Sequence, residues 1–182
     1  MTKARSNVMT DFGAPIIVLV LICVIMSGLL ALTNSATAPI IEEAERRANE
    51  EARLEVLPDA DSFEKVEAAG LPDAVREVYQ ASNGAGYTFS LTTTGYGGKN
   101  TLKMTIGIDG EGKLTGVKVL SHKETPGLGS KVTTEESFYG QFPGLDAAGA
   151  AAADTISGAT FSSNYYKAAI VDAFAAFEQV KG

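Results

Sequence analysis

Residues that could do chemistry concentrate in one run near the C-terminus, where an acid and several hydroxyl residues stand close to two residues that have almost no side chain. The run contains Asp154, Ser157, Gly158, Ala159 and Thr160, and a helix-like stretch follows it. The Gly-Ala pair lets the backbone come close to a bound group. The N–H groups that open a helix carry partial positive charge, which favours a phosphate. We therefore expect a phosphate beside Thr160, and the alternative is an ordinary tight turn in a chain with 19 glycines.

A second run suited to ligand contact lies upstream, where a proline and two glycines surround a single leucine. It contains Glu124, Thr125, Gly127, Leu128 and Gly129. Proline fixes φ and glycine allows unusual backbone angles, so the leucine is held out between two bends. An apolar side chain presented in this way suits the face of a planar ring. A plain surface turn is the alternative.

A third run, Gly95-Tyr96-Gly97-Gly98-Lys99-Asn100, invites comparison with the P-loop of nucleotide triphosphatases. It lacks the first glycine at the required spacing, and Asn100 stands where Ser or Thr would bind magnesium. We therefore exclude a P-loop, and the run predicts a wide hairpin.

Together the three runs resemble the covalent FMN-binding domain shared by the RnfG and NqrC subunits of ion-translocating membrane redox complexes. The resemblance implies that Thr160 carries FMN through a phosphoester bond. It also implies a separate flavin transferase, which moves the FMN moiety from FAD onto the threonine with the assistance of magnesium. The residues expected around the cofactor are Thr160, Ser157, Gly158, Ala159, Asp154, Glu124, Thr125, Gly127, Leu128 and Gly129.

The roles of two neighbouring residues stay open at this stage. Asp154 could orient or deprotonate Thr160 for phosphoryl transfer, or it could form a local Asx turn. Tyr165 could touch the cofactor, although its helix face is first of all a core face. Relatives often have a Trp near the short helix that precedes the motif, and this chain has none. Which aromatic residue lies near the cofactor is therefore undecided.

The resemblance also implies a function. Among redox cofactors, a flavin is the only one that the residues of this sequence support. The short chain favours RnfG over NqrC, so the expected role is an FMN-bearing electron-transfer subunit of an Rnf complex. Such complexes couple electron transfer between ferredoxin and NAD to Na⁺ or H⁺ translocation, and the partners would be membrane flavin and iron-sulfur subunits. The alternatives are an NqrC-type subunit of a Na⁺-translocating quinone reductase, a stand-alone flavoprotein reductase and a cofactor-free, membrane-anchored binding module.

A membrane anchor is indicated near the N-terminus. From Phe12 to Ile41 there is no charged residue, and a helix of about 20 residues matches the hydrocarbon thickness of about 30 Å. We expect a cytoplasmic N-terminus over 1–11, a transmembrane helix over 12–36 and a helical, solvated stalk over 37–57. A cleaved signal peptide is the alternative. Lys3 and Arg5 precede the span, so the domain over 58–182 should lie outside the inner or plasma membrane.

That domain is expected to have an α+β fold with a mostly antiparallel sheet of about four strands. Apolar residues alternate from Tyr87 to Leu91 and from Leu102 to Ile108, as in a sheet with one covered face. A capping-box pattern at 133–136 predicts a helix running toward Phe142, whose aromatic residues are most simply core residues. A final helix over 164–180, with Ser163 as its N-cap, should pack on the sheet through apolar residues at helical spacing.

Composition excludes several other classes of function. The net charge of −7 and the absence of a basic stripe argue against a nucleic-acid partner. One cysteine, Cys23, allows no intrachain disulfide and no cysteine cluster for zinc or iron-sulfur centres. One histidine and the spacing of the carboxylates give no sign of a metal site.

Overall fold

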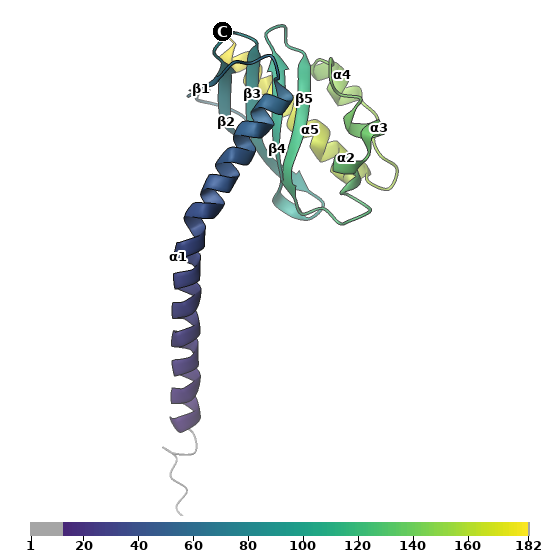
Figure 1. The fold of residues 1–182 in the computed structure, drawn as a ribbon. Helices are drawn as coiled ribbons and strands as arrows, with labels where there is room; N and C mark the ends of the chain where they lie inside the picture. The colour runs from purple at the N-terminus through teal and green to yellow at the C-terminus, as the bar shows by residue number, and fades with distance from the viewer. Residues whose placement is uncertain (1–12, 182) are drawn as a thin grey trace, which may run out of the picture. The chain divides into compact units, whose positions relative to one another are not determined.

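The computed structural model describes residues 13–181, and the expected cytoplasmic segment 1–11 and residue 12 lie outside them. The chain forms two compact units, 1–46 and 47–182. The elements are α1 (Ala14–Val56), β1 (Phe63–Val66), β2 (Val75–Ala81), β3 (Gly86–Gly95), β4 (Gly98–Asp109), β5 (Leu114–His122), α2 (Lys131–Thr134), α3 (Glu136–Tyr139), α4 (Ala147–Ala152) and α5 (Thr160–Val180) (Figure 1).

The first unit contains the apolar part of α1, which has the length and composition of a membrane-spanning helix. Its large apolar side chains, from Ile16 to Leu32, are exposed in the isolated chain, as expected for a surface that meets lipid. The helix continues through Pro39 without a break between the expected span and the expected stalk. Cys23 lies exposed within this segment.

The second unit contains a five-stranded antiparallel sheet in the order β1-β2-β3-β4-β5. The expected α+β architecture with an antiparallel sheet is confirmed, with one strand more than predicted. The extra strand is β1, a four-residue edge strand in which only Phe63 and Val66 are apolar, so its alternation is too short to detect. Hairpin turns join β2 to β3 at Asn83-Gly84 and β4 to β5 after Asp109, where the side chain of Asp109 accepts from the N–H of Glu111 and of Lys113.

The main core lies between one face of the sheet and α5, which Figure 1 shows running behind the strands. Alternation places Phe89 of β3 directly opposite Ile106 of β4 on this face. The apolar residues of α5 at helical spacing, including Ile170 and Phe177, meet them there as predicted. Burial of these side chains stabilises the fold, at about 25 cal/mol per Å² of apolar surface.

The opposite face of the sheet is covered by the end of α1, which the solvated-connector interpretation did not predict. Val56 is 2% exposed, and a Cβ added at Gly107 would overlap its carbonyl oxygen. The guanidinium of Arg53 lies 4.0 Å from the centre of the Tyr79 ring. The helix end is therefore part of the folded domain, and the expectation of a sheet with only one covered face is wrong here.

Two predicted helix starts are also wrong. The capping box does not form, because the segment divides at Glu135 into the single-turn helices α2 and α3. Helix α5 starts at Thr160, so Ser163 lies inside it rather than at its N-cap. The hydroxyl of Ser163 donates to the carbonyl of Ala159 and accepts from the N–H of Ile156, which braces the turn before the helix.

Candidate flavin site

The first two loop runs along the chain and the helix that follows the Asp154–Thr160 run meet at the carboxylate of Glu124, which is 5% exposed. One of its oxygens accepts a hydrogen bond of 2.8 Å from the N–H of Tyr96, in the turn between β3 and β4. The other accepts a hydrogen bond of 2.5 Å from the hydroxyl of Ser162, in the first turn of α5. Glu124 follows β5, so one buried side chain joins segments from three separate parts of the chain.

Two glycines make room for this carboxylate. A Cβ added at Gly95 or at Gly129 would overlap one of the Glu124 oxygens. Any larger residue would displace the carboxylate from its two donors. These glycines are therefore required by close packing against Glu124. From the sequence alone, Gly95 and Gly129 could be recognised only as members of glycine-rich runs.

Thr160 is the first residue of α5 and is exposed. The N-cap position is held by Ala159, which offers no side-chain hydrogen bond to the helix start. The first backbone bond of the helix runs from the N–H of Ser163 to the carbonyl of Ala159. The N–H groups of Thr160, Phe161 and Ser162 come before that bond, and such groups are available to an anion.

A pocket of about 170 Å³ is lined by the residues on either side of Thr160 in the chain, although Thr160 itself is not a lining residue. Its lining residues are Tyr96, Leu128, Gly129, Gly158, Ala159, Phe161 and Ser162. The structure therefore brings together Leu128, Gly129, Gly158 and Ala159 from the expected set. Leu128 is 54% exposed, in keeping with an apolar side chain held out between bends.

Sequence reasoning missed the aromatic part of this pocket. Tyr96 and Phe161 are 68% and 53% exposed, and their rings meet edge to face with centres 5.9 Å apart. The ring centres of Tyr165 and Phe161 are 4.8 Å apart, and Tyr165 does not line the pocket. Tyr96 follows Gly95 and Phe161 follows Thr160 in the sequence. Their position next to these motif residues is the one feature of the sequence that could have identified them.

The remaining expected residues do not line this pocket. The carbonyl of Thr125 accepts from the N–H of Leu128 and of Ser130, and Gly127 has a φ of +75° that only glycine adopts easily. Ser157 and Asp154 line a separate, open hollow of about 370 Å³.

The backbone of Asp154 is fixed by the side chain of Gln141. The Asp154 N–H donates to Gln141 Oε1 at 2.9 Å, and Gln141 Nε2 donates to the Asp154 carbonyl at 3.2 Å. This pairing holds the start of the motif in place. Within residues 13–181, no group of three or more His, Cys, Asp or Glu side chains could hold a metal ion.

Comparison with known proteins finds two matching families. Residues 95–175 match the FMN-binding domain family, and residues 17–56 match the RnfG N-terminal region. The first match includes all three runs, and the second spans most of α1.

Three similar proteins are G subunits of ion-translocating redox complexes. The G subunit of an ion-translocating oxidoreductase complex from Methanosarcina acetivorans is 34% identical over 87% of this chain and 88% of its own length. The protein of the same name from Stutzerimonas stutzeri is 37% identical over 70% of this chain and 59% of its own. The G subunit of the Na⁺-translocating ferredoxin:NAD⁺ oxidoreductase complex from Acetobacterium woodii is 38% identical over 64% of this chain and 63% of its own.

The chain thus spans about three fifths of the length of two of these relatives and most of the third. A membrane-anchor helix, an FMN-binding domain and a relative matched along nearly its full length all point to one group of proteins, and the chain belongs to the family of RnfG subunits of ion-translocating oxidoreductase complexes.

Proposed function

We propose that this chain is an electron-transfer subunit of an Rnf complex and carries FMN as a phosphoester on Thr160. The observation that carries the proposal is the position of Thr160, which is exposed at the start of a 21-residue helix, while residues on both sides of it in the chain line a pocket with apolar and aromatic walls. The complex would couple electron transfer between ferredoxin and NAD to Na⁺ or H⁺ movement.

The residues present fit a flavin phosphate. The helix start supplies N–H donors and a favourable dipole for the phosphate, and the Ala159 N-cap leaves those donors uncontested by a side chain. Leu128, Tyr96 and Phe161 supply an apolar surface for a flat ring. The pocket volume of about 170 Å³ is below the usual range for cofactor sites, about 300 Å³ and more, so the ring would remain partly exposed. Partial exposure suits a cofactor that exchanges electrons with neighbouring subunits.

In this mechanism the flavin supplies the electron chemistry, and the chain holds it in place. The Thr160 hydroxyl is the attachment point, and its ester removes dissociation as a route of cofactor loss. Glu124 fixes the hairpin of Tyr96, the loop of Leu128 and the start of α5 in one arrangement. Asp154 stands at the open hollow beside the motif, where it could orient Thr160 for a maturing flavin transferase.

Covalent attachment is tested by expressing the chain together with a flavin transferase and inspecting a denaturing gel under ultraviolet light. We expect a fluorescent band at the mass of the chain, its loss in Thr160→Ala and its persistence in Thr155→Ala, which removes a neighbouring threonine. Fluorescence that survives Thr160→Ala would move the attachment elsewhere. A colourless wild-type chain would favour a cofactor-free binding module.

The proposed topology places the FMN domain outside the membrane. In a Cys23→Ser background, a cysteine introduced by Asp73→Cys should react with a membrane-impermeant maleimide in intact cells. A cysteine introduced by Thr2→Cys should react only after lysis. The opposite pattern would place the domain in the cytoplasm.

A further inference from the structure

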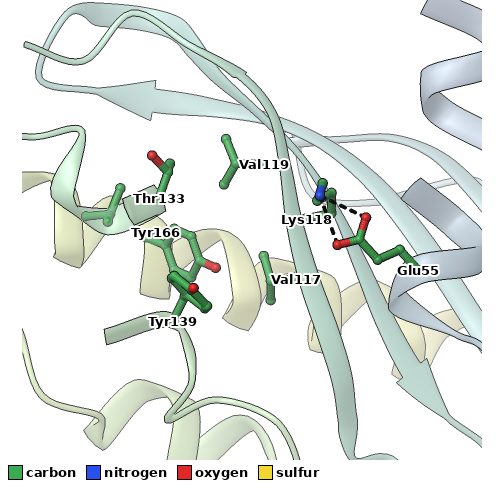
Figure 2. Close-up of a pocket in the computed structure, with 8 residues that line it drawn as sticks. Glu55, Val117, Lys118, Val119, Thr133, Tyr139 and Tyr166 are labelled. Atoms are coloured by element: carbon green, nitrogen blue, oxygen red, sulfur yellow. Dashed lines mark hydrogen bonds and ion pairs between the residues drawn. The ribbon is translucent and has the colours of Figure 1, made fainter. Parts of the chain in front are cut away.

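A second cavity, of about 250 Å³, lies between β5 and the short helices α2 and α3. It shares no lining residue with the pocket beside Thr160. Val117 and Val119 of β5 form one side, and the ring of Tyr139 of α3 belongs to the helical side (Figure 2). Val132 of α2 also lines the cavity. The cavity is therefore bounded on two sides by apolar groups.

Tyr166 of α5 closes the inner end of this cavity. It is 1% exposed, and its ring is held by Phe138 and Phe142, with ring centres 5.2 and 5.4 Å away. Figure 2 shows its hydroxyl directed toward Val117. The packed ring fixes the direction in which the hydroxyl points.

The Tyr166 hydroxyl has no hydrogen-bond partner among residues 13–181, and burial alone raises its pKa above the ordinary value of 10. The phenol therefore keeps its proton at any physiological pH and is a permanent donor. The Tyr166 hydroxyl is not among the fully enclosed unpaired atoms of the described residues, so it opens onto the cavity and is free to donate to a ligand there.

Three other polar side chains of the cavity are already engaged. The ammonium of Lys118 lies 2.8 Å from the carboxylate of Glu55 at the rim, with both side chains about half exposed. The hydroxyl of Thr133 donates to the carbonyl of Ser130 at 2.8 Å. Since the charges at the rim neutralise each other, the cavity does not call for a charged ligand.

We propose that this cavity binds a small neutral ring compound whose carbonyl oxygen accepts a hydrogen bond from Tyr166. Apolar walls on two sides favour a flat body, and the volume is below the range of drug-sized sites, which limits the ligand to about one ring. A carbonyl suits a permanent donor, because it can only accept. The site does not depend on the flavin and can be tested on unmodified protein.

The test uses the full chain in lipid nanodiscs, with methyl-labelled valine observed by NMR. Acetophenone is the probe, and ethylbenzene is the matched control that lacks the carbonyl. Acetophenone should shift the methyl signals of Val117, Val119 and Val132 in a saturable manner. Tyr166→Phe removes the hydroxyl and keeps the ring, and it should weaken acetophenone binding about fivefold, as expected for one hydrogen bond.

Ethylbenzene should bind the wild-type chain and Tyr166→Phe equally. Tyr79→Phe, which removes a hydroxyl elsewhere in the sheet, should leave acetophenone binding unchanged. A melting temperature for Tyr166→Phe no lower than that of the wild type would show that the hydroxyl is not needed for folding. Equal acetophenone affinity in the wild type and Tyr166→Phe, or methyl shifts confined to other valines, would overturn the proposal.

Discussion

At the scale of single residues, Glu124 is the side chain on which the candidate site depends most. Its two oxygens serve two donors, the Tyr96 N–H and the Ser162 hydroxyl, in a space left by two glycines. A buried carboxylate is stable only when its charge is compensated by such hydrogen bonds. The same side chain therefore supports both the fold and the placement of the flavin loops.

We predict that Glu124→Gln lowers the free energy of unfolding by about 1–3 kcal/mol. The NH₂ group of glutamine would replace one carboxylate oxygen and would face a hydrogen-bond donor, either the Tyr96 N–H or the Ser162 hydroxyl. Urea denaturation measures this change. Glu111→Gln, in an exposed turn, is the control and should leave stability unchanged. A Glu124→Gln chain as stable as the wild type would mean that the carboxylate does not join the three segments.

The sequence predicted the pocket residues Leu128, Gly129, Gly158 and Ala159 through the recognised runs, and the structure places them together. It did not predict that Glu124 would be buried. Glutamate is usually exposed, and the donors that compensate it come from residues far apart in the chain. Such convergence depends on tertiary packing and leaves no local signal.

At the scale of elements, helix α5 and the end of α1 pack on opposite faces of one sheet. The apolar period of α5 predicted its packing correctly. The start of the helix was misplaced because a serine near a helix end usually caps it, whereas Ser163 here braces the preceding turn. The packing of the end of α1 left no signal in the sequence. Its buried residues, Ala52, Arg53 and Val56, do not form an obvious apolar stripe.

Gly107→Ala tests the docking of the end of α1. The added Cβ would overlap the Val56 carbonyl oxygen and the Thr115 hydroxyl oxygen, so we expect a loss of about 1–3 kcal/mol in the free energy of unfolding. Hydrogen exchange should also become faster at residues 52–56. Gly110→Ala is the matched control, because its Cβ would approach no atom closer than 3.6 Å. Unchanged exchange at 52–56 in Gly107→Ala would contradict the docking.

Asp172 provides a pH-dependent test of the packing of α5. Partial burial raises the pKa of its carboxyl above the ordinary value of 3.8, so the ionised form is less stable in the folded than in the unfolded chain. Asp172→Asn should therefore stabilise the chain slightly at pH 7, and the gain should disappear as the pH falls through the raised pKa. Urea denaturation from pH 7 to pH 3, with the exposed Asp73→Asn as control, measures it. A gain that persists at pH 3 would exclude titration of Asp172 as its cause.

At the scale of the whole molecule, one anchor helix and one α+β domain make up the described chain. Length, hydropathy and the alternation of the strands were enough to predict both parts, because these are local patterns repeated over many residues. The two-faced covering of the sheet could not be predicted, since it requires the last residues of α1 to pack on strands that are distant in the sequence. Each part fits the proposed role, in which a membrane-held domain presents a fixed flavin to its partners.

The most direct test of that role is the intact mass of the full chain purified from cells that also express a flavin transferase. We predict a mass greater than that of the polypeptide by one FMN less one water, with the modification mapped to the peptide that contains Thr160. Thr160→Ala should have the mass of its amino acids alone. A wild-type chain of unmodified mass from such cells would contradict the account.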